Sequence, residues 1–255
     1  MLDPTSLKSL GRPVHYFQTI DTTMREAGER AGRGEPHGTV VIAEEQTAGR
    51  GRLGRTWSSA PGAGLYFSLI LRLELEAAQA PLVTLALGLA VARAIQQATN
   101  LACDLRWPND VLLGGRKCCG ILAELLGEDS RARSVIAGIG VNVNQREFSK
   151  DLAGTATSLY QQTGCEYSRE ALLAAILAEI DRHLAMLVDR GPAVIVELFS
   201  GASSYAAGKR VVVSGGAADL VGATAGLTAS GTLLLRLDDG QVTPVVAGSV
   251  RPVEQ

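Results

Sequence analysis

The chain has 255 residues, of which 24 are Lys or Arg and 26 are Asp or Glu, so its formal net charge is −2. This balance excludes a general nucleic-acid coat protein, which needs a strongly basic surface. Hydrophobic residues make up 46% of the sequence and charged residues 20%, a globular composition that excludes disorder as the main state. The length fits one large domain, or one large domain and a small one.

The cysteines and histidines have no spacing typical of a zinc site, so we expect no metal site built from protein side chains. Adjacent Cys118 and Cys119 are interpreted as buried thiols in a reducing compartment. The first residues contain no basic segment followed by an apolar run, and the longest uncharged stretch, residues 77–92, is shorter than the roughly 20 residues of a spanning helix. The sequence therefore predicts a soluble cytoplasmic protein with no membrane contact.

In the first half of the chain, strand and helix patterns are mixed. Thr23 and Glu26 have the spacing of a capping box and predict the start of a helix. Strands are expected at residues 39–43 and 65–73, where β-branched and apolar residues cluster. Residues 81–98 predict a helix with Pro81 in its first turn.

The second half begins with a predicted hairpin over residues 112–124, closed by Gly114-Gly115, and a buried strand over residues 134–144. Ser168 is the expected cap of a long helix with one apolar face. Short β runs follow, at residues 210–213, 220–225, 231–237 and 241–246. The prediction is an α+β fold with one domain over residues 1–203 and a small β-barrel over residues 204–255.

The most informative segment is the arginine loop, residues 44–57, which follows a predicted strand. Its glycines are Gly49, Gly51 and Gly54, and its arginines are Arg50, Arg52 and Arg55. The glycines match the pattern of a dinucleotide-binding turn, but the loop leads into another strand and not into the helix that such a turn requires. Glycine allows close backbone approach and arginine donates forked hydrogen bonds, so we favour an anion site over a solvated basic loop.

Three further segments are weak when taken singly. Trp107-Pro108-Asn109-Asp110 is ordinary turn chemistry. Lys117 stands at the entrance of a strand, where a lysine more often extends to water than binds a ligand. Asn142 lies in an apolar strand with Gly138 and Gly140, and it needs hydrogen-bond partners if it points inward.

Together and in this order, these segments resemble the signature of biotin protein ligases. The similarity includes the arginine loop with Trp57, Trp107-Pro108-Asn109-Asp110, Lys117 with the Gly120-Ile121-Leu122-Ala123-Glu124 run, and the glycine- and asparagine-containing strand at residues 138–144. It extends to Asp21-Thr22-Thr23 near the start and to residues 231–235 and 246–248. The resemblance thus covers nearly the whole chain.

The resemblance implies the catalytic fold shared by biotin and lipoate ligases, which is related to class II aminoacyl-tRNA synthetases, followed by a small β-barrel. It implies that residues 1–203 bind biotin and ATP, with Mg²⁺ accompanying the ATP. Biotin is activated to biotinyl-5′-AMP and transferred to a lysine of a biotin carboxyl carrier protein, such as the carrier domain of acetyl-CoA carboxylase. The site must therefore concentrate positive charge where a carboxylate meets a polyphosphate.

The resemblance also assigns roles to residues. Those expected to bind biotin are Thr22, Thr23, Gln46, Gly49, Arg50, Gly51, Arg52, Lys117 and Gly120. Those expected to bind ATP are Arg52, Arg55, Trp57, Asn109, Lys117 and Asn142. The residues expected to carry the catalysis are Arg52, Lys117 and Asp110.

Three positions depart from the family pattern: Met24 replaces a common Asn, Arg106 replaces a common Lys, and Leu53 replaces a common basic residue. Only about twenty residues precede Asp21, too few for a helix-turn-helix domain, so we expect a monofunctional ligase that does not bind DNA and is a monomer or a homodimer. Two alternatives stay open: a lipoate protein ligase of the same fold, and a non-catalytic biotin-binding protein.

Overall fold

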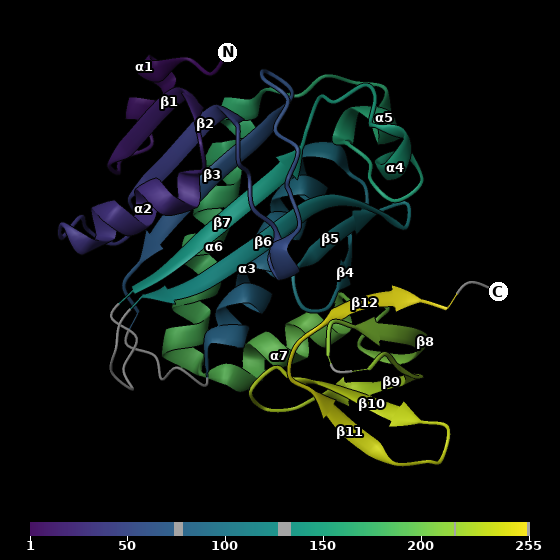
Figure 1. Cartoon of the computed structure of the whole chain (residues 1–255). Coiled ribbons are helices and arrows are strands. Elements are labelled where there is room, and N and C mark those ends of the chain that lie inside the picture. The colour runs from purple at the N-terminus through teal and green to yellow at the C-terminus, as the bar shows by residue number, and fades with distance from the viewer. Residues whose placement is uncertain (74–78, 127–133, 217, 254–255) are drawn as a thin grey trace.

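The computed structural model describes residues 1–73, 79–126, 134–216 and 218–253. Its centre is a seven-stranded sheet in the order β1-β2-β3-β7-β6-β5-β4 (Figure 1). The strands are β1 (Val14–Ile20), β2 (Val40–Gln46), β3 (Gly64–Leu71), β4 (Asp104–Arg106), β5 (Asp110–Leu113), β6 (Arg116–Leu126) and β7 (Ser134–Asn142). Strands β1 and β2 are parallel, and the other neighbouring pairs are antiparallel.

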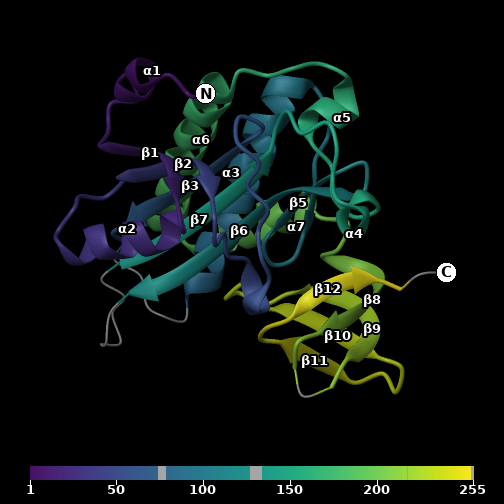
Figure 2. The same cartoon turned by 45° about the horizontal axis from the view of Figure 1, so that its top comes forward.

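Helices cover both faces of this sheet (Figures 1 and 2). One face carries α2 (Thr23–Gly32), and the other carries α3 (Ala80–Thr99), α6 (Arg169–Arg190) and α7 (Pro192–Gly201). The short helices are α1 (Pro4–Lys8), α4 (Lys150–Ala153) and α5 (Leu159–Thr163). Helix α3 contacts both α6 and α7 as well as the sheet, so the larger core lies on its side.

Strand β3 shows how one sheet supplies two cores, because successive side chains of a strand point to opposite faces. Phe67 and Leu69 belong to the large apolar cluster with α3 and α6, whereas Ile70 packs with Met24 and Ala27 of α2. Among the described residues, α3 alone is long and apolar enough to cross a membrane, but most of it is buried inside the protein. The first two residues of the uncharged stretch at 77–92 lie outside the described residues.

A second sheet of five antiparallel strands forms the C-terminal part, with the order β11-β10-β9-β8-β12. Its strands are β8 (Ala207–Ser214), β9 (Leu220–Leu227), β10 (Leu233–Leu237), β11 (Val242–Val245) and β12 (Ser249–Pro252). This C-terminal sheet lies beside the end of the main sheet that carries β4 and β5 (Figure 1). The α+β class is confirmed, while closure into a barrel and the domain boundary after residue 203 stay predictions.

Most expected elements are present, with shifted ends. Gly114 and Gly115 close the hairpin with positive φ angles of 55° and 75°, and the Ser168 side chain caps α6 by accepting from the amide of Ala171. The cap of α2, however, is Thr22 and not Thr23. Thr23 is the first residue of the helix and instead forms hydrogen bonds with Gln46 of β2 and Ser68 of β3, so its prediction as the cap was wrong.

Candidate functional site

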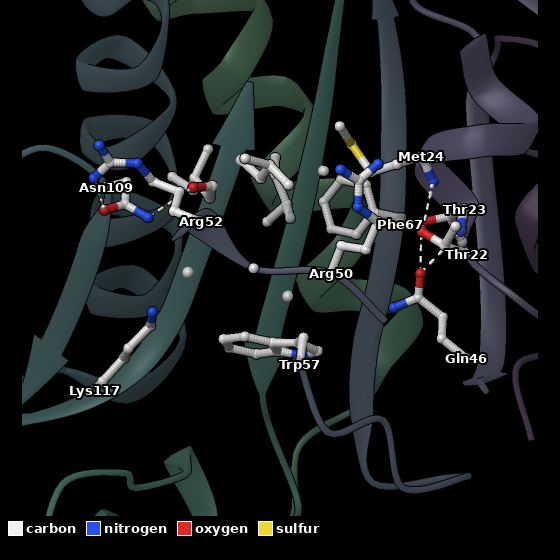
Figure 3. Close-up of a pocket in the computed structure, with 17 residues that line it drawn as sticks. Thr22, Thr23, Met24, Gln46, Arg50, Arg52, Trp57, Phe67, Asn109 and Lys117 are labelled. Atoms are coloured by element: carbon white, nitrogen blue, oxygen red, sulfur yellow. Dashed lines mark hydrogen bonds between the residues drawn. The ribbon is translucent and has the colours of Figure 1, made fainter. Parts of the chain in front are cut away.

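An open cavity lies between the start of α2, the arginine loop and the middle of β6 and β7 (Figure 3). The predicted site residues that line it are Thr22, Thr23, Gln46, Arg50, Gly51, Arg52, Trp57, Asn109, Lys117 and Gly120. Four predicted residues are not on its wall: Gly49, Arg55, Asp110 and Asn142. Segments far apart in the sequence are thus brought together around one cavity, with polar groups at both ends.

One end of the cavity is a network of neutral polar groups (Figure 3). The side-chain oxygen Oε1 of Gln46 accepts hydrogen bonds from the backbone amide and the hydroxyl of Thr23, at 2.9 and 3.1 Å. The Thr23 hydroxyl also lies 2.8 Å from the hydroxyl of Ser68, which is fully buried in β3. Gln46 Nε2 donates to the Ser59 hydroxyl at 3.2 Å. These side chains are therefore oriented by the protein itself before any ligand arrives.

The arginine loop is an antiparallel hairpin between β2 and β3. The Trp57 amide donates to the Gly49 carbonyl at 2.9 Å, and the Gly51 amide donates to the Arg55 carbonyl at 2.7 Å. A Cβ atom at Gly49 would lie 2.5 Å from the Trp57 carbonyl oxygen, so this position excludes any side chain. The loop contains one short 3-10 helix (Arg52–Gly54), but no α-helix lies between it and β3, so the dinucleotide-binding interpretation is excluded as expected.

Arg52 is held by two neutral acceptors. Its Nη1 donates to Asn109 Oδ1 at 3.1 Å and to the Gly248 carbonyl of the C-terminal part at 3.2 Å. Burial lowers the pKa of Arg52 from its ordinary value, but a guanidinium stays charged at neutral pH. Neither acceptor cancels that charge, so Arg52 presents a fixed cation to the cavity.

The other two arginines of the loop are less firmly held: Arg50 also lines the cavity, whereas Arg55 does not. Arg50 lies 3.5 Å from Glu124, and its side chain is more than half exposed. Arg55 donates to the Ser249 hydroxyl at 3.3 Å, so its contact is with the C-terminal sheet and not with the cavity.

A second fixed cation is Lys117, whose Nζ lies 2.6 Å from Asp110 Oδ1. The other carboxylate oxygen of Asp110 accepts from Arg106 Nη2 at 2.7 Å. Burial opposes ionisation of Asp110, but Lys117 and Arg106 outweigh it and hold the pKa of this carboxyl below its usual value. Asp110 therefore stays a carboxylate that holds Lys117 in place, and it does not itself reach the cavity.

Trp57 forms a flat wall between these cations and the polar end (Figure 3). A Cβ atom at Gly140 would lie 2.3 Å from Trp57 Cε2, and one at Gly120 would lie 2.9 Å from Trp57 Cζ3. The Lys117 ammonium lies 5.4 Å from the centre of the indole, within the range of a cation–π contact. The two glycines thus allow the indole to lie directly on the sheet beside Lys117.

Asn142 is buried behind the cavity, where its Nδ2 donates to the Thr157 carbonyl at 3.0 Å. The expected need for a partner is met, but no contact with the cavity follows. Ser59 and Ser68 could not be predicted as part of the site, because isolated serines carry no pattern. The apolar lining residues that the resemblance did not assign are Phe67, Ile121, Leu122 and Ile139, together with Met24.

Residues 16–142 match the Biotin/lipoate A/B protein ligase family. The Bacillus subtilis bifunctional ligase/repressor BirA is 37% identical over 91% of this chain and 71% of its own length. The Mycobacterium tuberculosis biotin–[acetyl-CoA-carboxylase] ligase is 31% identical over 91% of this chain and 86% of its own length. The structure of Aquifex aeolicus biotin protein ligase in complex with biotin and ATP is similar, with a TM-score of 0.81, 32% identity, and coverage of 94% of this chain and 99% of that one.

Proposed function

The chain belongs to the biotin/lipoate A/B protein ligase family, and we propose that it condenses biotin with ATP and then transfers the biotinyl group to a lysine of a biotin carboxyl carrier protein. The observation that carries this proposal is a single cavity with a neutral polar end and two fixed cations, Arg52 and Lys117, at the other. The neutral end suits an uncharged polar ring, and the cationic end suits a carboxylate beside a phosphate.

In the first step, a biotin carboxylate oxygen attacks the α-phosphorus of ATP and pyrophosphate leaves with the electron pair of the broken P–O bond. Two anions must approach one another, so the cations contribute by offsetting their repulsion. Lys117, oriented by Asp110 and Trp57, would contact the biotin carboxylate and the α-phosphate. Arg52, oriented by Asn109 and Gly248, would contact the phosphate from the arginine loop. Neither residue has to move far, which lowers the reorganisation cost of the reaction.

The ureido ring of biotin is proposed to lie at the neutral end. It presents two N–H donors and one carbonyl acceptor, and Thr22, Thr23 and Gln46 offer matching groups. Met24 lies where the family often has Asn, so it replaces a polar contact with an apolar one. Lipoate has a dithiolane ring with no hydrogen-bond donors, so it would form fewer hydrogen bonds with Thr22, Thr23 and Gln46 than the ureido ring does. This difference favours biotin over lipoate.

We propose that Mg²⁺ enters with ATP as part of the substrate, with phosphate oxygens and water as most of its ligands. Among the residues that the structure describes, no group of three His, Cys, Asp or Glu side chains could hold a metal ion. Asp110, the nearest acidic residue to the two cations, has both carboxylate oxygens paired. A substrate-borne ion is consistent with that arrangement.

The test is biotin-dependent formation of biotinyl-AMP from ATP, followed by transfer of labelled biotin to a carrier domain. Arg52→Ala and Lys117→Ala should each slow adenylate formation about a hundredfold, close to 3 kcal/mol of transition-state stabilisation. Arg50→Ala, in the same loop but paired with Glu124 at the surface, is the matched comparison and should lose less. Pyrophosphate release with lipoate and none with biotin would favour the lipoate ligase. Binding of biotin without any formation of biotinyl-AMP would favour a non-catalytic binding protein.

A further inference from the structure

A second, open cavity adjoins the site on the side of the C-terminal sheet. Arg52, Ile121 and Leu122 line both cavities, so the two meet at the cationic end of the first one. The remaining walls come from the first turns of α3, from Trp107 and Pro108, from Ala123 of β6, and from Val246 between β11 and β12. Nothing in the first reaction step described above uses this space.

The walls of the second cavity are almost entirely apolar. Arg52 is the only charged residue among the described residues that line it, and no carboxylate is present. The indole N–H of Trp107 is already committed, because it donates to the Gly231 carbonyl at 2.9 Å. Val246 stands at the rim with 85% of its surface exposed, so the cavity is open to a protein surface.

We propose that this second cavity is the entry for the acceptor lysine of the carrier protein, an inference that rests on the proposed function. A lysine side chain is a flexible aliphatic stem with a terminal amine, and apolar walls suit that stem. The cavity leads to Arg52, beside the position proposed above for the activated biotin carbonyl. The carrier backbone would stay outside, near Val246, while only the lysine side chain enters.

The apolar walls would also favour the neutral, nucleophilic form of the incoming lysine amine. A free lysine is protonated at neutral pH, and an ammonium ion has no lone pair for attack. An apolar entry without carboxylates, ending beside the Arg52 guanidinium, disfavours the ammonium and lowers the pKa of the incoming amine. The neutral amine nitrogen then bonds to the carbonyl carbon of biotinyl-AMP, the carbon–oxygen bond to the phosphate breaks, and AMP leaves with that electron pair. The surplus amine proton passes to solvent.

The rival occupant is the adenosine part of ATP. A purine base presents ring nitrogens and an exocyclic amine that must find partners when buried. The second cavity offers only the Thr84 side chain and Arg52 as polar side chains that remain after the Trp107 donor is used. The lack of partners favours the aliphatic stem of a lysine.

Two variants test the entry. Thr84→Phe fills the cavity from α3, and Val246→Asp places at its rim a carboxylate that would keep an incoming amine protonated. Val188→Asp is the matched control, because Val188 is also exposed, at 57%, but lies on α6 away from both cavities. Three rates are measured for the full chain: formation of biotinyl-AMP from biotin and ATP, transfer to a carrier domain, and trapping of biotinyl-AMP by hydroxylamine, a nucleophile too small to need the entry.

We expect Thr84→Phe and Val246→Asp to slow transfer to the carrier about tenfold or more, with adenylate formation and hydroxylamine trapping within about twofold of the parent. In Val246→Asp the pH dependence of the transfer rate should also shift to higher pH, while Val188→Asp should change none of the three rates.

Unchanged transfer in Thr84→Phe and Val246→Asp overturns the proposal. An equal loss of adenylate formation also overturns it, because that result assigns the cavity to the nucleotide. If Thr84→Phe does not fold, the transfer rate of Val246→Asp is sufficient to test the proposal. If the parent protein forms no biotinyl-AMP, the result contradicts the proposed function itself and not only the assignment of the second cavity.

Discussion

Two glycines of the site matter because they have no side chain and so leave room for the Trp57 indole. Gly140 and Gly120 lie under the Trp57 indole, and a Cβ atom at either would come within 3 Å of the ring. The ring in turn lies beside the Lys117 ammonium. The position of the Lys117 ammonium therefore depends on two glycines in neighbouring strands.

We predict that Gly140→Ala displaces Trp57 and lowers the rate of adenylate formation about tenfold, because Lys117 loses the surface that orients it. Steady-state kinetics give the rate, and the indole fluorescence reports whether the ring has moved. Gly154→Ala is the control, because a Cβ atom there meets nothing within 4 Å and the backbone, at φ −83°, accepts alanine. An unchanged rate together with unchanged fluorescence in Gly140→Ala contradicts the prediction.

At this scale the motifs predicted much of the cavity. Arg52, Lys117, Thr23 and Gln46 all line it as expected. Asp110 was expected to take part in catalysis; the structure pairs it with Lys117 and Arg106, and its catalytic role stays a prediction. Which carboxylate reaches the ligand and which supports a neighbour depends on side-chain packing, and a motif carries no information on that.

At the scale of elements, helix α6 is fixed to the sheet and to the end of the arginine loop by one buried ion pair. Arg169 Nη1 donates to Glu44 Oε2 at 2.8 Å and to the Gly64 carbonyl at 3.2 Å. Glu44 also accepts from the Gly62 amide at 3.1 Å and from the Leu2 amide. The pair formed by Arg169 and Glu44 therefore holds Gly62 and Gly64, at the start of β3, against α6.

We predict that Arg169→Met lowers the free energy of unfolding at neutral pH by about 3–5 kcal/mol, because it leaves Glu44 buried without its cation. Urea unfolding curves measure the change. Arg182→Met is the control on the same helix, since the Arg182 side chain is 65% exposed and its loss should cost little. A change of the same size in both variants contradicts the assigned role of the pair.

The same variant has a predicted pH dependence. Burial opposes ionisation of Glu44, but hydrogen bonds from Arg169 and from the Leu2 amide outweigh it and keep the pKa below the ordinary 4.5. This group therefore stabilises the parent protein above pH 4.5, and the stabilisation is lost as the pH falls through the lowered pKa. Without Arg169 the pKa of Glu44 should rise, so the difference in stability between variant and parent should shrink below pH 4.5. A difference that is constant with pH contradicts the explanation.

Long periodic elements were predictable, and short ones were not. The helix capped by Ser168 and the hairpin closed by Gly114 and Gly115 follow from local patterns. Strands β1, β4 and β12 and helix α7 were missed. Strand β1 has no fully buried residue, and β4 and β12 have only three and four residues, so none has a clear alternation of apolar and polar side chains.

At the scale of the whole molecule, the C-terminal sheet is tied to the main sheet at the site itself. Trp107 Nε1 donates to the Gly231 carbonyl, and Arg52 and Arg55 donate to Gly248 and Ser249. The C-terminal sheet thereby supplies one of the two acceptors that hold Arg52. This contact gives the C-terminal part a direct role in orienting Arg52, which lines the cavity.

We predict that Trp107→Phe loosens the C-terminal sheet, because it removes the hydrogen bond to Gly231 while keeping an aromatic ring. The loss should be about 1 kcal/mol, seen as about fivefold faster hydrogen exchange in β10. Tyr160→Phe is the control, because it removes an exposed hydrogen bond with Arg146. Unchanged exchange in Trp107→Phe contradicts the link between the two sheets.

The sequence by itself determined the family, the class of reaction and most residues of the cavity, because that chemistry needs particular residue types within short contiguous motifs. The tertiary structure alone decided which distant groups meet. The Glu44 and Arg169 pair spans 125 positions, and the Arg52 contact with Gly248 spans 196. Such contacts depend on how sheets and helices pack, and no local pattern encodes them. The second cavity has the same origin, since its walls come from α3, β6 and the C-terminal sheet.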